Sequence, residues 1–262
     1  ARTIEHYRQN AADLAATYHT AADGVSGYFK QAFSAGDSVL DIGCGSGRDL
    51  DYLRSAGFDI AGVDPVGEMI KEGENLYPEL HGKLHVGALP DLDMFEDGSF
   101  NGVVCSGVLM HIPEAHLFDS VWEIRRVLKA GGILLVSLPM DESIEDFRDD
   151  RGRFFNGLLP DRLQLLLERI GFRETRRWKS DDSLGRPDRK WVTQLFRLNG
   201  GDGTRSIDRI ESVLNRDKKT ATYKLALFRA LAELAQTSYN LAIWRVDGKV
   251  LIPIHVIAEK WI

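Results

Sequence analysis

Cysteine is scarce in this sequence of 262 residues, which contains only Cys44 and Cys105. Two cysteines are too few for a disulfide framework, and neither has the spacing of a metal ligand. No apolar run approaches the ~18 residues that a membrane-spanning helix needs. The N-terminus also lacks the apolar stretch of a secretory leader. We therefore expect a cytoplasmic protein with no membrane segment and no metal site.

Composition and charge predict a folded chain of two units. The apolar fraction of 44% is enough for a sizeable core and argues against disorder. The net charge of −6 is unevenly distributed: residues 204–262 contain 10 Lys and Arg and 6 Asp and Glu, a net charge of +4, whereas the remaining residues carry −10. Together with the linker-like NGGDG at 199–203, this predicts a main domain at 1–200 and a small basic module at 204–262.

Short apolar runs alternate with helix-like stretches over much of the chain. The predicted strands are SVLDIG, FDIAGVD, KLHVGAL, FNGVVCSG and ILLVSLP. This alternation favours a parallel sheet with helices on both faces. Two later β-rich runs, at 172–180 and 190–198, are joined by a turn-rich link and predict an antiparallel pair at the sheet edge. Residues 204–262 are predicted to be mainly helical.

The segment VLDIGCGSG at 39–47 places three glycines directly after a predicted strand. Glycines there let a ligand approach the backbone closely at the N-terminus of the next helix. A dinucleotide loop has the spacing G-x-G-x-x-G, whereas this one is G-x-G-x-G. Asp41 would also repel a pyrophosphate, because two like charges ~4 Å apart cost ~4 kcal/mol at a surface-like dielectric. The same carboxylate would attract the ammonium of a methionine group.

A second acid, Asp64, ends the next predicted strand, 21 residues after Gly43. That is close to the ~20-residue offset at which an acid accepts hydrogen bonds from ribose hydroxyls. Dinucleotide sites and S-adenosylmethionine sites share this feature, so Asp64 does not distinguish between them. The position of Asp41 favours an S-adenosylmethionine site.

These motifs resemble those of the class I S-adenosylmethionine-dependent methyltransferases. VLDIGCGSG looks like their first motif and GVDPVGEMI, at 62–70, like their second. Residues 86–112 and 128–139 resemble the later motifs, and the strand pair within 172–198 resembles the last two strands. The resemblance covers about residues 4–198. It implies an α/β, Rossmann-like fold with a seven-stranded, mostly parallel sheet whose last strand is antiparallel.

The resemblance also implies a cofactor site for S-adenosyl-L-methionine, with S-adenosyl-L-homocysteine as the product. Asp41 would orient the methionine ammonium, Asp64 would bind the ribose hydroxyls, and Gly43, Gly45 and Gly47 would line the methionine and ribose. Six further positions complete the predicted cofactor site: Cys44 in the loop, Pro65, Ala88 and Leu89 around the adenine, Ser106 at the methionine end, and Tyr18 closing over the cofactor. Many relatives have an acid where Ala88 stands, which predicts weaker adenine recognition here.

The methyl acceptor is less clearly indicated. His111, in LMHIP, follows the fourth predicted strand and is the candidate general base; the alternative is that it shapes the acceptor site or the helix entry. The same strand end lacks the Asn/Asp-Pro-Pro-aromatic signature of nucleobase amino methylation, which favours a small-molecule acceptor. Residues 141–160, with three phenylalanines among charges, predict either a lid or a surface loop packed on its own aromatic rings.

Three functions therefore remain open. The first is a methyltransferase for a small molecule, using in-line displacement. The second is a nucleic-acid or protein methyltransferase recruited by the basic module, where Arg216, Lys218 and Lys219 cluster at a predicted helix start. The third is a partner subunit that binds the cofactor without turnover. The basic cluster is also explained as the solvated end of an amphipathic helix.

Overall fold

The computed structural model describes residues 2–140, 147–187, 189–200, 230–231, 243–244 and 250–252. The chain divides into two compact units, at 1–205 and 206–262. In the second unit, the described residues comprise helical Ala230 and Leu231 and an antiparallel pair of strands, β10 (Ile243–Trp244) and β11 (Val250–Leu251). The sequence did not predict this strand pair. The predicted basic cluster at 216–219 lies outside the described residues.

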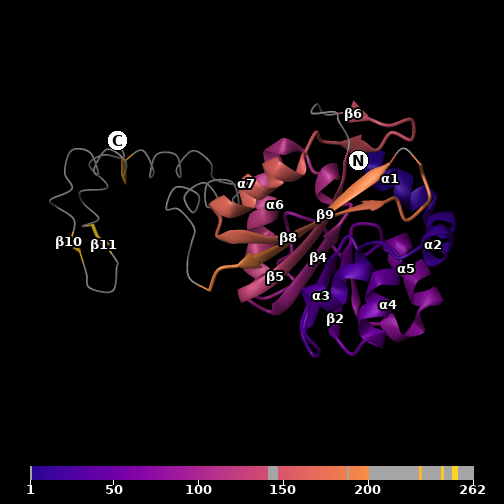
Figure 1. Cartoon of the computed structure of the whole chain (residues 1–262), viewed down its shortest axis with the longest axis horizontal. Helices are drawn as coiled ribbons and strands as arrows, with labels where there is room; N and C mark the ends of the chain where they lie inside the picture. Colours follow the sequence, from indigo (N-terminus) through magenta and orange to yellow (C-terminus); the bar gives the residue numbers. More distant parts are fainter. Residues whose placement is uncertain are drawn as a thin grey trace. The chain divides into compact units, whose positions relative to one another are not determined.

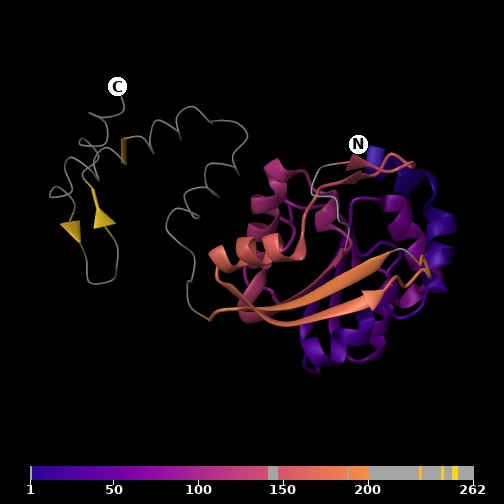
Figure 2. The same ribbon diagram turned by 45° about the horizontal axis from the view of Figure 1, so that its top comes forward.

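The first unit is built on one sheet of seven strands (Figure 1). Its strand order is β3-β2-β1-β4-β5-β9-β8. The first five run parallel, while β9 is antiparallel to both of its neighbours. Figure 2 shows β8 and β9 side by side as the long final pair. The predicted Rossmann-like sheet with its antiparallel last strand is therefore confirmed. The strands are β1 (Ser38–Ile42), β2 (Asp59–Asp64), β3 (Leu84–Val86), β4 (Phe100–Ser106), β5 (Leu128–Pro139), β8 (Phe172–Asp181) and β9 (Lys190–Leu198).

Helices cover both faces of this sheet (Figure 1). Alternate strand residues point to opposite faces, so Val103 of β4 belongs to one core and Val104 to the other. The first core packs against α6 and α7, and the second against α3, α4 and α5. The helical segments are α1 (Arg2–Gln9), α2 (Ala11–His19), η1 (Val25–Tyr28), α3 (Phe29–Ala32), α4 (Arg48–Ser55), α5 (Gly67–Leu76), η2 (Pro78–Leu80), η3 (Leu109–His111), α6 (Glu114–Val127) and α7 (Pro160–Arg169).

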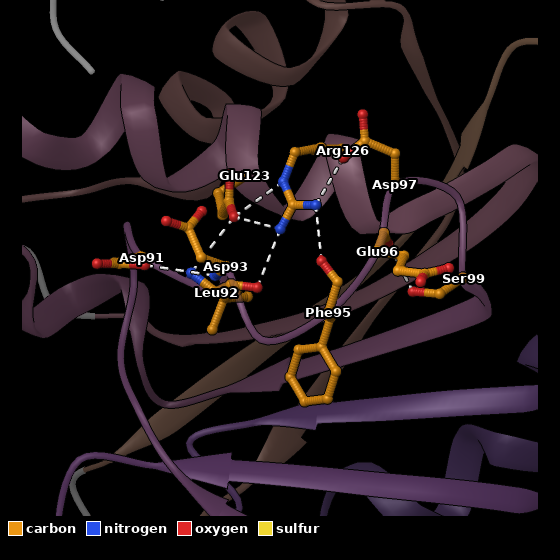
Figure 3. Close-up of polar contacts among 9 residues, drawn as sticks. All are labelled: Asp91, Leu92, Asp93, Phe95, Glu96, Asp97, Ser99, Glu123 and Arg126. Atoms are coloured by element: carbon orange, nitrogen blue, oxygen red, sulfur yellow. Dashed lines mark hydrogen bonds and ion pairs between the residues drawn. The ribbon is translucent and has the colours of Figure 1, made fainter. Parts of the chain in front are cut away.

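An ion pair on α6 holds the loop that follows β3 (Figure 3). The Arg126 guanidinium lies 2.6 Å from Glu123 Oε1 and donates to the carbonyl oxygens of Leu92, at 3.0 Å, and Phe95, at 2.8 Å. It also donates to Asp97 Oδ1 at 2.7 Å. The Glu123 side chain is 1% exposed, and its carboxylate raises the pKa of Arg126 above the usual range. This contact fixes the loop whose first residues line the cavity described below.

Candidate functional site

A cavity of about 680 Å³ lies at the carboxyl ends of the parallel strands. Within the sheet, β2 lies on one side of β1 and β4 lies on the other, so the strand order reverses at β1. Parallel α/β sheets bind ligands in the crevice at such a reversal of strand order. Asp41 and Ile42 of β1, Asp64 of β2 and Ser106 of β4 all line the cavity. The strand order therefore brings together residues that are far apart in the sequence.

The structure gathers nearly all the predicted site residues around this cavity. Those that line it are Tyr18, Asp41, Gly43, Cys44, Gly45, Asp64, Pro65, Ala88, Leu89, Ser106 and His111. Gly47 is not among the lining residues. It has a φ of +77°, and a Cβ added there would lie 2.6 Å from Leu80 Cδ1. Glycine at this position therefore serves the turn into α4 and its close packing on η2, rather than contact with a ligand in the cavity.

Asp64 ties the glycine loop to β2. Its Oδ2 accepts a hydrogen bond from Gly45 N at 3.0 Å, and its Oδ1 accepts one from Val66 N at 2.8 Å. Burial raises the pKa of Asp64 to about 6, although both backbone hydrogen bonds act in the opposite direction. Each carboxylate oxygen keeps a further lone pair. Asp64 can thus hold the loop and accept a hydrogen bond from a bound hydroxyl at the same time.

Among the acids that line the cavity, Asp41 is the one whose negative charge is least balanced by neighbouring groups. It is 4% exposed, and no residue in the described part of the chain forms a hydrogen bond with its carboxylate. Burial is the main cause that raises its pKa well above the usual value, and the carboxylates of Asp49 and Asp64 add to the effect. Arg48 opposes them, but its guanidinium is engaged with Asp49, where Nε donates to Oδ1 at 3.0 Å. This end of the cavity therefore favours a cation.

His111 lies in η3, just after β4, and lines the cavity. Its Nδ1 is 2.5 Å from the carbonyl oxygen of Phe154. A carbonyl oxygen only accepts, so Nδ1 carries the proton and Nε2 carries the lone pair. Nε2 is buried and has no hydrogen-bond partner within the described residues. Burial lowers the pKa of His111 to about 4, so the ring is neutral near pH 7.

Arginines form a part of the cavity wall that the sequence analysis missed. Arg148 belongs to the hairpin of β6 (Phe147–Arg148) and β7 (Phe154–Phe155), Arg153 directly precedes β7, and Arg189 ends the link between β8 and β9. The Arg148 guanidinium lies 5.6 Å from the Phe154 ring centroid, and those of Arg153 and Arg189 lie 5.4 and 5.6 Å from the Phe155 centroid. The arginines interleaved with phenylalanines at 147–155 were the sequence signal that could have predicted this part of the cavity wall.

The sequence left two interpretations open for this segment, a lid over the site and a surface loop packed on its own aromatic rings. The hairpin has features of both. Phe155 is 1% exposed and stacks on Phe147, with ring centroids 5.0 Å apart, as a self-packed loop would. Phe154, Arg148 and Arg153 line the cavity, as the wall of a binding site would. Residues 141–146 lie outside the described residues.

The N-terminal helices close the cavity from another side. Thr3 Oγ1 accepts a hydrogen bond from Phe154 N at 2.9 Å, which joins α1 to the hairpin; Figure 1 shows β6 beside the N-terminus. Tyr7 and Tyr18 both line the cavity and pack on the small core of Ala11, Val66 and Met69. Burial raises the pKa of Tyr18 to about 12, so its phenol stays protonated. The N-terminal helices therefore place both phenols at the site.

This sheet and this glycine loop match a known family. Residues 40–136 match a family model described as a methyltransferase domain. This part of the chain is therefore similar to methyltransferase domains. The methyltransferase fold also extends beyond the matched residues. A crystal structure of Burkholderia thailandensis 1,6-didemethyltoxoflavin-N1-methyltransferase superposes with a TM-score of 0.65 and 18% identity, over 76% of this chain and 88% of that one. That enzyme was crystallised with 1,6-didemethyltoxoflavin and S-adenosylhomocysteine.

Curated relatives align with part of the chain. A ubiquinone biosynthesis O-methyltransferase from Xanthomonas oryzae is 30% identical over 105 residues, which is 39% of this chain and 43% of that protein. Its counterpart from Xylella fastidiosa is 31% identical over 111 residues, or 41% and 44% of the two chains. The chain thus spans less than half the length of these curated relatives. Residues 203–262 match a separate model, described as a domain of unknown function (DUF8808).

No helix in the described part of the chain has both the length and the apolar character needed to cross a membrane. Nor does that part of the chain contain a group of three or more His, Cys, Asp or Glu side chains arranged to bind a metal ion.

Proposed function

We propose that this chain is an S-adenosylmethionine-dependent methyltransferase that acts on a small molecule. The observation that carries the proposal is the acidic end of the cavity, where Asp41 is buried beside Asp64 with no hydrogen-bonded partner for its carboxylate within the described residues. Burying an ionised carboxylate is costly unless a cation or hydrogen-bond donors compensate it. A ligand with an ammonium group supplies that compensation, whereas a pyrophosphate adds to the repulsion.

The residues of the cavity fit the parts of this cofactor in order. Asp41 would accept from the methionine ammonium, and Asp64 would accept from the ribose hydroxyls through its free lone pairs. Pro65, Ala88 and Leu89 would border the adenine. The Ala88 carbonyl already accepts a hydrogen bond from Asp91 N at 2.9 Å. Adenine recognition on this side would therefore depend on shape and on the remaining backbone groups.

When bound, S-adenosylmethionine supplies a methyl group on a sulfonium, with a neutral thioether as leaving group. The protein's task is to hold the acceptor in line with that methyl group, and such positioning can lower a barrier by ~7–11 kcal/mol. His111 Nε2 would accept the proton of the attacking hydroxyl or amine, because its lone pair is free and its ring is neutral. A general base of this kind contributes on the order of 10²–10⁴ in rate.

The walls of the cavity support a small acceptor over a macromolecule. Helices α1 and α2, the β6–β7 hairpin and the β8–β9 link all contribute lining residues. A chain of nucleic acid or protein would need an open groove at this position. The structural relative from Burkholderia is named for a small molecule, 1,6-didemethyltoxoflavin, which agrees with this proposal.

The test is a binding and transfer experiment on the full chain. S-adenosylhomocysteine and NAD⁺ are titrated separately by calorimetry, and the radiolabelled methyl group of S-adenosylmethionine is followed into a small-molecule extract and into a nucleic-acid and protein fraction. The proposal predicts binding of S-adenosylhomocysteine alone and label in the small-molecule fraction. Binding of NAD⁺ alone would overturn the cofactor assignment, and label only in macromolecules would overturn the acceptor class.

A further inference from the structure

The cavity carries opposite charges at its two ends. The carboxylates of Asp41 and Asp64 lie near the ends of β1 and β2, and that of Asp49 lies in the first turn of α4. The lining also includes Arg148, Arg153, Arg186 and Arg189, of which Arg153 and Arg189 lie close enough to His111 to affect its protonation. The acidic end faces the expected cofactor, so the basic end is left for the acceptor.

Two of these arginines already have carboxylate partners. Arg153 lies 2.6 Å from Asp149 Oδ2, and Arg186 lies 2.6 Å from Asp182 Oδ1. Arg148 differs, because no carboxylate within the described residues pairs with it. Its guanidinium donates to the Gly152 carbonyl oxygen at 2.9 Å and lies over the Phe154 ring. Arg148 is exposed to solvent and retains donors for a ligand.

Arg148 and the candidate base are connected through one residue. The Phe154 carbonyl accepts the proton of His111 Nδ1, and the ring of the same Phe154 packs beneath the Arg148 guanidinium. Arg153 and Arg189 disfavour the protonated form of the His111 ring, whereas Asp149 favours it. The arginines that line the cavity at this end favour an anion beside a neutral imidazole.

The remaining lining at this end is largely aromatic. Tyr7, Phe154 and Trp191 line the cavity, and the Tyr7 ring lies edge-on to His111 at a centroid distance of 6.3 Å. Trp191 is held by a hydrogen bond from its Nε1 to Asp182 Oδ1 at 2.8 Å. Flat aromatic walls suit a planar ligand, and a guanidinium binds a carboxylate through two parallel hydrogen bonds.

We propose that the methyl acceptor is a small aromatic anion, whose carboxylate is bound by Arg148 while its hydroxyl or amine lies at His111 Nε2. This inference rests on the proposed methyltransferase function. In the transfer, a bond forms between the methyl carbon and the acceptor's oxygen or nitrogen. The electron pair of the broken carbon–sulfur bond stays on sulfur, and the acceptor's proton goes to His111 Nε2. The arginines keep the anion in place during this exchange and lower the cost of burying its charge.

The test compares an acid with its neutral analogue on the full chain saturated with S-adenosylhomocysteine. The probes are 3,4-dihydroxybenzoate and 3,4-dihydroxybenzamide, titrated by calorimetry at millimolar concentration. The acid should bind about tenfold or more tightly than the amide, as expected for a charge-assisted hydrogen-bonded pair. Arg148→Gln should remove that preference, and Arg148→Lys should retain part of it. Arg173→Gln, an exposed arginine of β8 outside the cavity, should leave it unchanged.

Equal affinity for the acid and the amide in the unaltered chain would overturn the inference, and so would a preference that survives Arg148→Gln or the absence of binding by both probes. These outcomes leave the proposed function standing as long as S-adenosylhomocysteine binds. If S-adenosylhomocysteine itself fails to bind, the proposed function is what fails.

Discussion

Asp64 Oδ2 accepts a hydrogen bond from Gly45 N, so the acid at the end of β2 fixes the backbone of the loop that follows β1. The two residues are 19 positions apart in the sequence and belong to different motifs. A carboxylate with a raised pKa at this junction couples protonation to the shape of the loop. Several testable consequences concern this coupling and the residues around it.

Binding of S-adenosylhomocysteine should release protons near pH 6. Without ligand, the pKa of Asp64 is about 6 and that of Asp41 is well above the usual value, so part of the population is protonated. The ligand's ammonium and hydroxyls favour the ionised carboxylates, and affinity should therefore rise as the pH increases from 5 to 7. Calorimetry in two buffers of different ionisation enthalpy measures the release directly. An observed enthalpy that is independent of the buffer at pH 6 would contradict this linkage.

His111→Gln should lower kcat by on the order of 10²–10⁴ while the affinity for S-adenosylhomocysteine stays unchanged. The reason is that the substitution removes the lone pair at Nε2 and leaves the acidic end of the cavity intact. His81→Gln is the matched control, because His81 is exposed and its ion-pair partner within the described residues is Glu74. A loss of cofactor affinity as large as the loss of kcat would assign His111 a binding role instead.

The pH profile gives a second measure of His111. Its pKa is about 4, lowered mainly by burial, so the neutral base persists as the pH falls through 6.5. A rate that depends on this base should therefore not decline at the ordinary histidine pKa. The unfolded chain takes up a proton at this side chain below pH 6.5 and the folded chain does not. His111 thus contributes stability above 6.5 that is progressively lost between 6.5 and about 4. Denaturant titrations of the unaltered chain and His111→Gln over this range check the sign.

Arg126→Met should destabilise the fold strongly by leaving Glu123 buried without its guanidinium partner. Loss of one member of a buried ion pair costs ~3–5 kcal/mol. The control is Arg162→Met, whose pair with Glu114 is more than half exposed on both sides and should contribute ~0–1 kcal/mol. The difference is measured by chemical denaturation. Equal effects of the two substitutions would show that the loop after β3 does not depend on the contacts drawn in Figure 3.

Gly47→Ala should reduce stability more than Gly36→Ala. Both glycines have a positive φ, of +77° and +82°, so both substitutions carry the backbone strain of ~1 kcal/mol or more. Only at Gly47 does an added Cβ meet a close neighbour, Leu80 Cδ1 at 2.6 Å. Because Gly47 does not line the cavity, affinity for S-adenosylhomocysteine per folded molecule should change little. Comparison of thermal unfolding with binding in the two variants separates these effects.

The sequence predicted the sheet well because the periodicity of the strands and the glycines at the ends of helices and strands are local signals. Boundaries were less accurate: the predicted strand ILLVSLP begins at Ile133, whereas β5 begins at Leu128, directly after α6 ends at Val127. The acceptor end was mostly missed. Arg148 and Arg189 approach His111 only through the hairpin and the β8–β9 link, and no local pattern encodes that proximity. His111 was found because it follows a predicted strand, yet its tautomer depends on the distant Phe154 carbonyl.

The central claim is that Asp41 attracts a cationic methionine group, and its most direct test is the affinity of Asp41→Asn for S-adenosylhomocysteine. The substitution keeps the side chain's size and removes its charge. Asp59→Asn, at the exposed start of β2, is the matched control. Calorimetric titration should show a loss of about tenfold to a hundredfold for Asp41→Asn and none for Asp59→Asn, as expected for a charged hydrogen bond. Unchanged affinity in a folded Asp41→Asn chain would contradict the account.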